Sequence, residues 1–145
     1  REGYSMKDTN CAYCMENELL DKFGIKICDL NVSMLYLFKE QSHPGRVIVA
    51  YKDHVSEIVD ITPEEQSAFF ADVRRAAEAI HKAFAPQKLN YGAYGDTGCH
   101  LHMHLVPKYT GEFEWGGTFA MNPDRTYLTA EQYQEMIDRI KAALS

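Results

Sequence analysis

Short segments of this chain alternate hydrophobic and polar positions with a period of two. This alternation is typical of β-strands, because successive side chains in a strand leave opposite faces. Combined with enrichment in β-branched and aromatic residues, it predicts strands over residues 25–30, 33–39, 46–51, 89–94 and 100–106. Turn-forming segments rich in Gly, Pro, Asp and Asn separate them, as in His43-Pro44-Gly45.

Three other segments are expected to be helical. A short helix is predicted over residues 13–23 and is expected to end at Gly24. A long helix begins after the capping hydroxyl of Thr62 and continues to about Phe84, and a last helix covers residues 129–144.

The order of these elements indicates the fold class. Because sequential strands with short connections pair with one another, we expect an α+β fold. It would have a mainly antiparallel sheet of about five strands covered by two main helices. The expected organisation is an N-terminal tail at residues 1–10 and a single domain at 11–145, in which 110–145 extends the core.

The segment from His100 to Val106 has the most informative pattern. Three histidines, His100, His102 and His104, alternate with apolar residues that a strand would direct into a core. Histidine changes charge near neutral pH and is a common metal ligand, so three of them on one strand face indicate catalysis, metal binding or both.

A single catalytic metal held by all three histidines is one possibility, as in hydrolytic zinc sites. In a regular strand, however, the Cα atoms of His100 and His104 lie about 13 Å apart, whereas metal–nitrogen bonds are about 2.1 Å. The pair Cys11 and Cys14 offers other ligands, because a CxxC with two histidines forms a closed tetrahedral zinc site. A CxxC without metal and a redox pair are the alternatives.

Composition limits the function classes. The chain has 145 residues, a formal charge of −6 and four cysteines, and its longest apolar runs are too short to span a bilayer. An acidic chain is a poor ligand for nucleic-acid polymers, which are bound through many Lys and Arg contacts. We therefore expect a soluble protein of the cytoplasm, without a nucleic-acid or membrane partner.

Three features of the chain together resemble the histidine triad (HIT) superfamily, specifically its zinc-containing bacterial-type nucleotide hydrolases. They are the histidine segment, the upstream CxxC, and the stretch Pro44-Gly45-Arg46-Val47-Ile48-Val49 followed by Lys52-Asp53-His54. Members cleave nucleotides at the α-phosphate through a covalent nucleotidyl-histidine and commonly form homodimers. The resemblance implies that His102 is the nucleophile and that His104 donates to the developing charge. It also implies a structural Zn²⁺ held by Cys11, Cys14, His54 and His100.

The same resemblance suggests substrate-binding residues. The loop that contacts the phosphate in the family corresponds to residues 90–98, so Asn90, Asp96 and Thr97 are candidates. Arg46 stands where the family usually has histidine, and a guanidinium fork suggests a phosphate clamp.

Two further differences from the family concern the substrate. Phe38 occupies the position of the acid that holds the ribose, and Glu40 is the nearest acidic residue. The segment 112–119 is expected either to cover the mouth of the site or to form a dimer surface.

The sequence thus predicts a hydrolase that acts on a diadenosine polyphosphate or a nucleoside phosphoramidate. A zinc-stabilised nucleotide-binding module with little turnover is the first alternative. A metallohydrolase with three histidine ligands is the second.

Overall fold

A computed structural model describes residues 8–145 of the chain. Its core is a sheet of five antiparallel strands in the order β1-β2-β3-β5-β4. The strands are β1 (Gly24–Asp29), β2 (Ser33–Phe38), β3 (Val47–Tyr51), β4 (Lys88–Gly92) and β5 (His102–Lys108). The helices are α1 (Ala12–Met15), α2 (Glu18–Asp21), α3 (Pro63–Phe84) and α4 (Ala130–Leu144), with a short 3-10 helix at Ile58–Asp60. The predicted fold class is confirmed.

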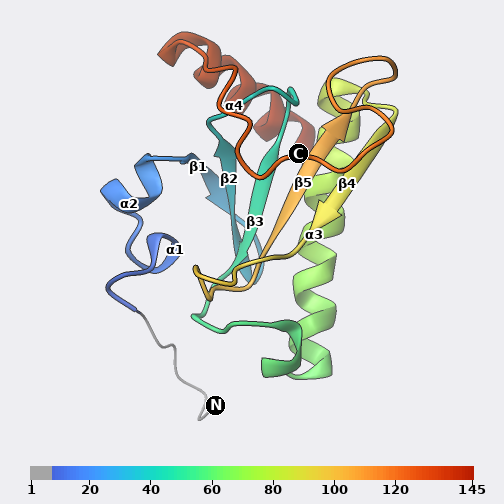
Figure 1. Cartoon of the computed structure of the whole chain (residues 1–145). Coiled ribbons are helices and arrows are strands. Elements are labelled where there is room, and N and C mark those ends of the chain that lie inside the picture. The colour runs from blue at the N-terminus through green and yellow to red at the C-terminus, as the bar shows by residue number, and fades with distance from the viewer. Residues whose placement is uncertain (1–7) are drawn as a thin grey trace.

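One face of the sheet is covered by the two long helices, α3 and α4 (Figure 1). Each helix starts with a capping box, in which Thr62 or Thr129 accepts from the third residue of the helix. Alternate strand residues, including Leu35, Val49 and Leu105, pack between the sheet and these helices. This is the main hydrophobic core.

The other face carries the short helices and the histidines. Alternate positions of β2 and β3, among them Tyr36, Ile48 and Ala50, form a second apolar cluster with Tyr13 of α1. The register pairs Ile48 with His104 and Ala50 with His102, so both histidines project from this second face. The period-two pattern therefore assigned β5 to its correct faces.

Several predicted boundaries differ from the structure. The single helix expected at residues 13–23 is two helices, because Glu16 has a left-handed backbone and the Asn17 side chain caps α2 by accepting from Leu19. Gly24 begins β1 instead of ending a helix. Strand β5 begins at His102, so His100 lies just before the strand.

Among residues 8–145, no helix has both the length and the apolar character needed to cross a bilayer. Residues 1–7 of the predicted N-terminal tail lie outside the described part of the chain.

Candidate functional site

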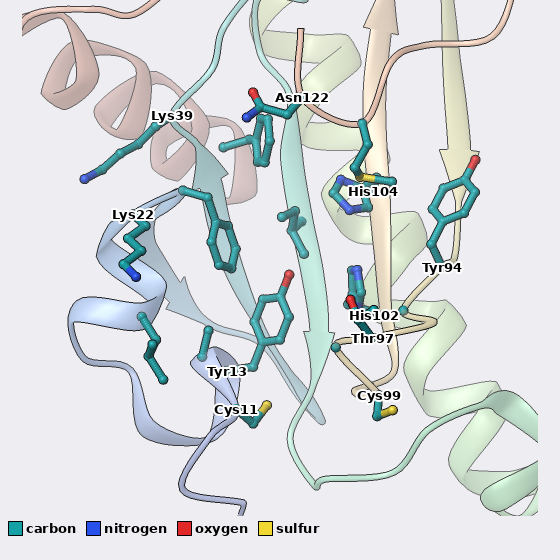
Figure 2. A pocket seen from close by; sticks show the side chains of 18 of the residues that line it. Cys11, Tyr13, Lys22, Lys39, Tyr94, Thr97, Cys99, His102, His104 and Asn122 are labelled. Carbon is teal, nitrogen blue, oxygen red and sulfur yellow. The ribbon is translucent and has the colours of Figure 1, made fainter. Parts of the chain in front are cut away.

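His102 is held in one tautomer by the backbone. Its Nδ1–H donates to the carbonyl oxygen of His100 at 2.6 Å. The Nε2 atom therefore carries a lone pair, and the ring lines a cavity (Figure 2). Burial lowers the pKa of His102, which favours the neutral ring. A neutral imidazole fixed in this way has the properties of a nucleophile.

His104 has the opposite arrangement. Its Nδ1 lies 3.2 Å from Nη2 of Arg46, and because a guanidinium can only donate, Nδ1 accepts. The proton then resides on Nε2, on a ring that also lines the cavity. Burial, with smaller contributions from the Arg46 charge and His102, lowers the pKa of His104 to about 3. The ring is neutral near pH 7 and offers an N–H donor.

The two rings are neighbours, with centroids 5.1 Å apart. One presents a lone pair and the other an N–H donor. This combination suits attack on an electrophile whose oxygens gain negative charge during the reaction.

The cavity in front of them has a volume of about 820 Å³, large enough for a nucleotide-sized ligand. Its lining includes side chains from both ends of the chain (Figure 2). These are Asp8, Asn10, Cys11, Ala12, Tyr13, Leu19, Lys22, Phe23, Phe38, Lys39, Glu40, Ile48, Tyr94, Gly95, Asp96, Thr97, Gly98, Cys99, His102, His104, Met121, Asn122 and Tyr127.

The predicted substrate residues are only partly brought together. Asp96 and Thr97 lie on the cavity, in the loop between β4 and β5. Asn90 lies within β4, paired with Val106 and outside the cavity lining. Their contacts with a substrate remain predictions.

Arg46 is placed differently from the predicted phosphate clamp. It is fully buried behind His104, and its terminal nitrogens donate to His104 and to the carbonyls of Ala120 and Met121. It is not among the cavity-lining residues. A phosphate clamp needs guanidinium N–H groups facing the ligand, so the contact of Arg46 is with His104 instead.

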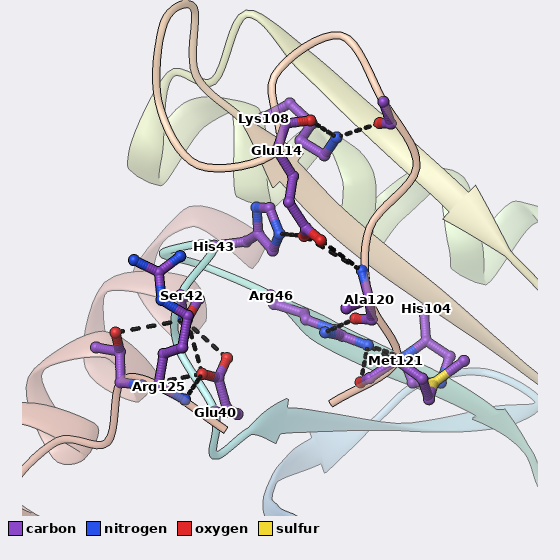
Figure 3. Close-up of polar contacts among 12 residues, drawn as sticks. Glu40, Ser42, His43, Arg46, His104, Lys108, Glu114, Ala120, Met121 and Arg125 are labelled. Carbon is purple, nitrogen blue, oxygen red and sulfur yellow. Dashed lines mark hydrogen bonds and ion pairs between the residues drawn. The ribbon is translucent and has the colours of Figure 1, made fainter. Parts of the chain in front are cut away.

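Glu40, the acidic residue nearest to the expected ribose position, forms hydrogen bonds within the protein. It is 2% exposed and accepts from Ser42, Arg125 and Thr126, so its oxygens join the turn after β2 to the segment before α4 (Figure 3). These bonds lower the pKa of Glu40 against the opposing effect of burial. Its carboxylate is therefore engaged by Ser42 and by two backbone N–H groups, while Glu40 also lines the cavity, so a contact with the ribose stays a prediction.

The segment between β5 and α4 reaches the cavity. Phe119 lies with its ring centroid 6.3 Å from that of His104 and 6.1 Å from that of Tyr94, and Met121 lines the cavity. Glu114 fixes the segment by bonding His43 at 2.6 Å and the Ala120 N–H. Phe119, the last residue of the segment 112–119, thus lies beside His104, and whether this segment covers the mouth of the site or forms a dimer surface stays a prediction.

Sequence reasoning missed several lining residues. Tyr13 lies inside the CxxC and has its ring centroid 5.1 Å from that of His102. Tyr94 follows β4, and Asn122 and Tyr127 come from the segment before α4. Only the position of Tyr13 between two candidate ligands gave any signal, because the others reach the site through long-range folding.

A second cluster lies beside the histidine pair. The ligand atoms of Cys11, Cys14, His54 and His100 all lie within 4.8 Å of one another. Four of the sulfur–nitrogen and nitrogen–nitrogen separations are 3.4, 3.3, 3.7 and 3.2 Å. A tetrahedral Zn²⁺ with standard bond lengths places its ligands about 3.3–3.8 Å apart, so this donor set fits the metal.

The orientation of His100 supports the same assignment. Its Nε2–H donates to the carbonyl of Tyr51 at 2.7 Å, which leaves the Nδ1 lone pair facing the two cysteines. Burial lowers the pKa of His100 to about 4, so this nitrogen is unprotonated near pH 7. Such an outer hydrogen bond is typical of metal-ligating histidines.

Comparison with known proteins agrees with this arrangement. The HIT domain family model matches residues 25–111. A bis(5'-nucleosyl)-tetraphosphatase (asymmetrical) of Schizosaccharomyces pombe is 32% identical over 75 residues, which cover 48% of this chain and 41% of that protein. The chain thus spans less than half of this relative.

Solved structures share the fold. A histidine triad protein of Sinorhizobium meliloti has a TM-score of 0.80 at 23% identity, covering 88% of this chain and 94% of that one. A zinc-bound histidine triad family protein of Mycobacterium smegmatis has a TM-score of 0.67 at 23% identity, covering 93% of each chain. With the family model matching more than half of its length, this chain belongs to the HIT domain family.

Proposed function

We propose that this protein is a nucleotide hydrolase that acts at the α-phosphate of a dinucleoside polyphosphate through a covalent nucleotidyl-histidine. The observation that carries the proposal is the opposite orientation of two neighbouring rings on one cavity. His102 offers a lone pair, and His104 offers an N–H.

In the first step, Nε2 of His102 attacks the α-phosphorus, and the bond to the bridging oxygen breaks. That oxygen leaves with the electron pair as the end of the remaining phosphate chain. His104 donates a hydrogen bond to the phosphoryl oxygens while their charge develops. Water then attacks the phosphorus of the nucleotidyl-histidine, releases the nucleoside monophosphate and a proton, and restores neutral His102.

The protonation state of His104 distinguishes the two predicted substrate classes. With a pKa of about 3, this ring donates a hydrogen bond near neutral pH but has no spare proton to transfer. A polyphosphate departs as an anion without protonation, whereas the amine of a phosphoramidate needs a proton. This argument favours the polyphosphate, as does the name of the S. pombe relative.

The proposed metal at Cys11, Cys14, His54 and His100 is a structural Zn²⁺. When bound, it would cross-link the N-terminal segment to the start of the catalytic strand. All four ligands come from the protein, so no position remains for substrate. His100 connects the two sites, because its side chain belongs to the cluster and its carbonyl orients His102. A homodimer is proposed from the family resemblance alone.

The test is the intact mass of the protein after rapid mixing with diadenosine tetraphosphate or with an adenosine phosphoramidate. Wild type is expected to gain the mass of one adenylyl group and then release AMP, with faster turnover of the tetraphosphate. His102→Ala is expected to gain no mass, whereas His81→Ala, which changes an exposed residue of α3, is the matched control. Nucleotide binding with neither adduct nor AMP would refute the hydrolase and support a nucleotide-binding module.

A further inference from the structure

Within the described part of the chain, Arg46 is a buried cation without a direct ion pair, since the carboxylates of Glu40 and Glu114 act on its charge only from a distance. Its side chain is 0% exposed, and among residues 8–145 no ion pair to it is present within bonding distance. Its Nε is a buried polar atom without a hydrogen bond. Burying a charge in this way costs stability, so the packing of the fold alone does not account for an arginine at this position.

The guanidinium is nevertheless held on several sides. Phe38 and Phe119 lie on it, with ring centroids 4.0 and 5.1 Å from Cζ. Its terminal nitrogens donate to the carbonyl of Ala120 at 3.3 Å and to that of Met121 at 2.9 Å (Figure 3). A donor fixed by two carbonyls and two aromatic rings cannot turn away from its remaining partner.

Besides a weak contact with Sδ of Met121 at 3.8 Å, that remaining partner is Nδ1 of His104, at 3.2 Å. We propose that Arg46 is a positioning residue that donates to this nitrogen and so commits His104 to the tautomer whose Nε2–H faces the cavity. The inference rests on the proposed function for its catalytic consequence, but the tautomer itself is a property of the resting protein.

An arginine performs this task in a way that a hydroxyl, which can also accept, would not. It has no lone pair to offer, so it excludes the tautomer with a proton on Nδ1. Its charge also opposes protonation of the ring to imidazolium. His104 faces two other titratable groups, His102 on β5 and Tyr94 after β4, while Phe38 and Phe119 are uncharged.

The same guanidinium joins His104 to the segment before α4. The guanidinium of Arg46 donates both to the carbonyls of Ala120 and Met121 and to the ring of His104. The position of this segment and the orientation of the His104 ring therefore both depend on the Arg46 side chain. Loss of Arg46 is therefore expected to affect the chemical step more than substrate binding.

The direct test is ¹⁵N NMR of the histidine side chains, with the His104 signals assigned by their loss in His104→Gln. Wild type is expected to show an unprotonated Nδ1 and a protonated Nε2 throughout the pH range in which it is folded. In Arg46→Met, the second tautomer is expected to appear and the pKa of His104 to rise, because the Arg46 charge contributes to lowering it. Arg46→Lys, which retains a charged donor, is expected to keep Nδ1 unprotonated.

Kinetics with diadenosine tetraphosphate supply a second readout. Arg46→Met is expected to lower kcat about tenfold or more and to change KM by less than about threefold, as for a group that acts only in the transition state. A protonated Nδ1 in wild type would overturn the inference, even if Arg46→Met failed to fold. Identical His104 titration and tautomer in wild type and a folded Arg46→Met would also overturn it. Because these NMR outcomes need no turnover, they separate this inference from the proposed function.

Discussion

Replacing His104 by glutamine tests whether the fold holds this ring neutral. Glutamine can accept from Arg46 through its carbonyl and present an N–H to the cavity, so it preserves both hydrogen bonds while removing the titration. The folded pKa of His104 is about 3, below its unfolded value of about 6.5. Below about pH 6.5 the unfolded chain binds a proton that the folded protein does not, so stability is lost progressively as the pH falls toward about 3.

The magnitude follows from the same values. One pKa unit corresponds to about 1.4 kcal/mol, so between about pH 7 and pH 5 this single group removes about 2 kcal/mol from the free energy of unfolding. The loss over this interval should be smaller in His104→Gln than in wild type by that amount. Other titrating groups contribute to both proteins and largely cancel in the difference.

The assay is urea unfolding of both proteins at the two pH values, followed by circular dichroism. His81→Gln, on the exposed side of α3, is the matched control and should lose as much stability as wild type. If His104→Gln also loses as much as wild type, His104 is not held neutral at pH 5, and Nδ1 could not then accept from Arg46, because an imidazolium carries a proton on both nitrogens.

Two further predictions concern the metal cluster and the turn before β3. Purified protein should contain about one equivalent of zinc, and Cys14→Ser should lower both the zinc content and the thermal midpoint of unfolding. Cys28→Ser, which changes a cysteine outside the cluster, should keep the zinc. Equal zinc content in the two variants would exclude the cluster as the metal site. Gly45→Ala should destabilise the protein by about 1–3 kcal/mol in denaturant unfolding, because Gly45 has φ +95° and an added Cβ would lie 2.8 Å from Phe84. Gly117→Ala, where an added Cβ meets no atom within 4 Å, should change stability little, and an equal loss in both variants would argue against the strain.

The sequence predicted most of the fold because local patterns and core packing agree. The capping residue Thr62 marked the start of α3, the helix predicted over residues 129–144 matches α4, and alternation assigned His102 and His104 to one face of β5. The helix predicted over residues 13–23 was wrong because Asn17 caps a new helix and Glu16 contacts Tyr36 and Lys26. A residue engaged in such tertiary contacts does not follow the local helical pattern.

In the candidate site, too, some residues could be predicted from the sequence, whereas the role of others became evident only in the structure. The histidine spacing marked His102 and His104, and the CxxC marked two metal ligands, because each of these depends on residue types at short spacing. The addition of His54 and His100 to the metal cluster came from the family resemblance, and the structure brings all four residues together. The role of Arg46 could not be derived, since it depends on which groups surround a side chain. Its partners, Ala120 and Met121, lie more than seventy residues along the chain.

The sequence by itself therefore determined which residue types are available for ligation and catalysis and where they lie along the chain. It also determined that His102 and His104 share one face of β5. Only the tertiary structure decided the tautomers, because these depend on the carbonyl behind His102 and the guanidinium behind His104. It also decided the burial that lowers the pKa of both rings. Period and spacing are local properties, whereas hydrogen-bond partners and desolvation arise from segments that meet only on folding.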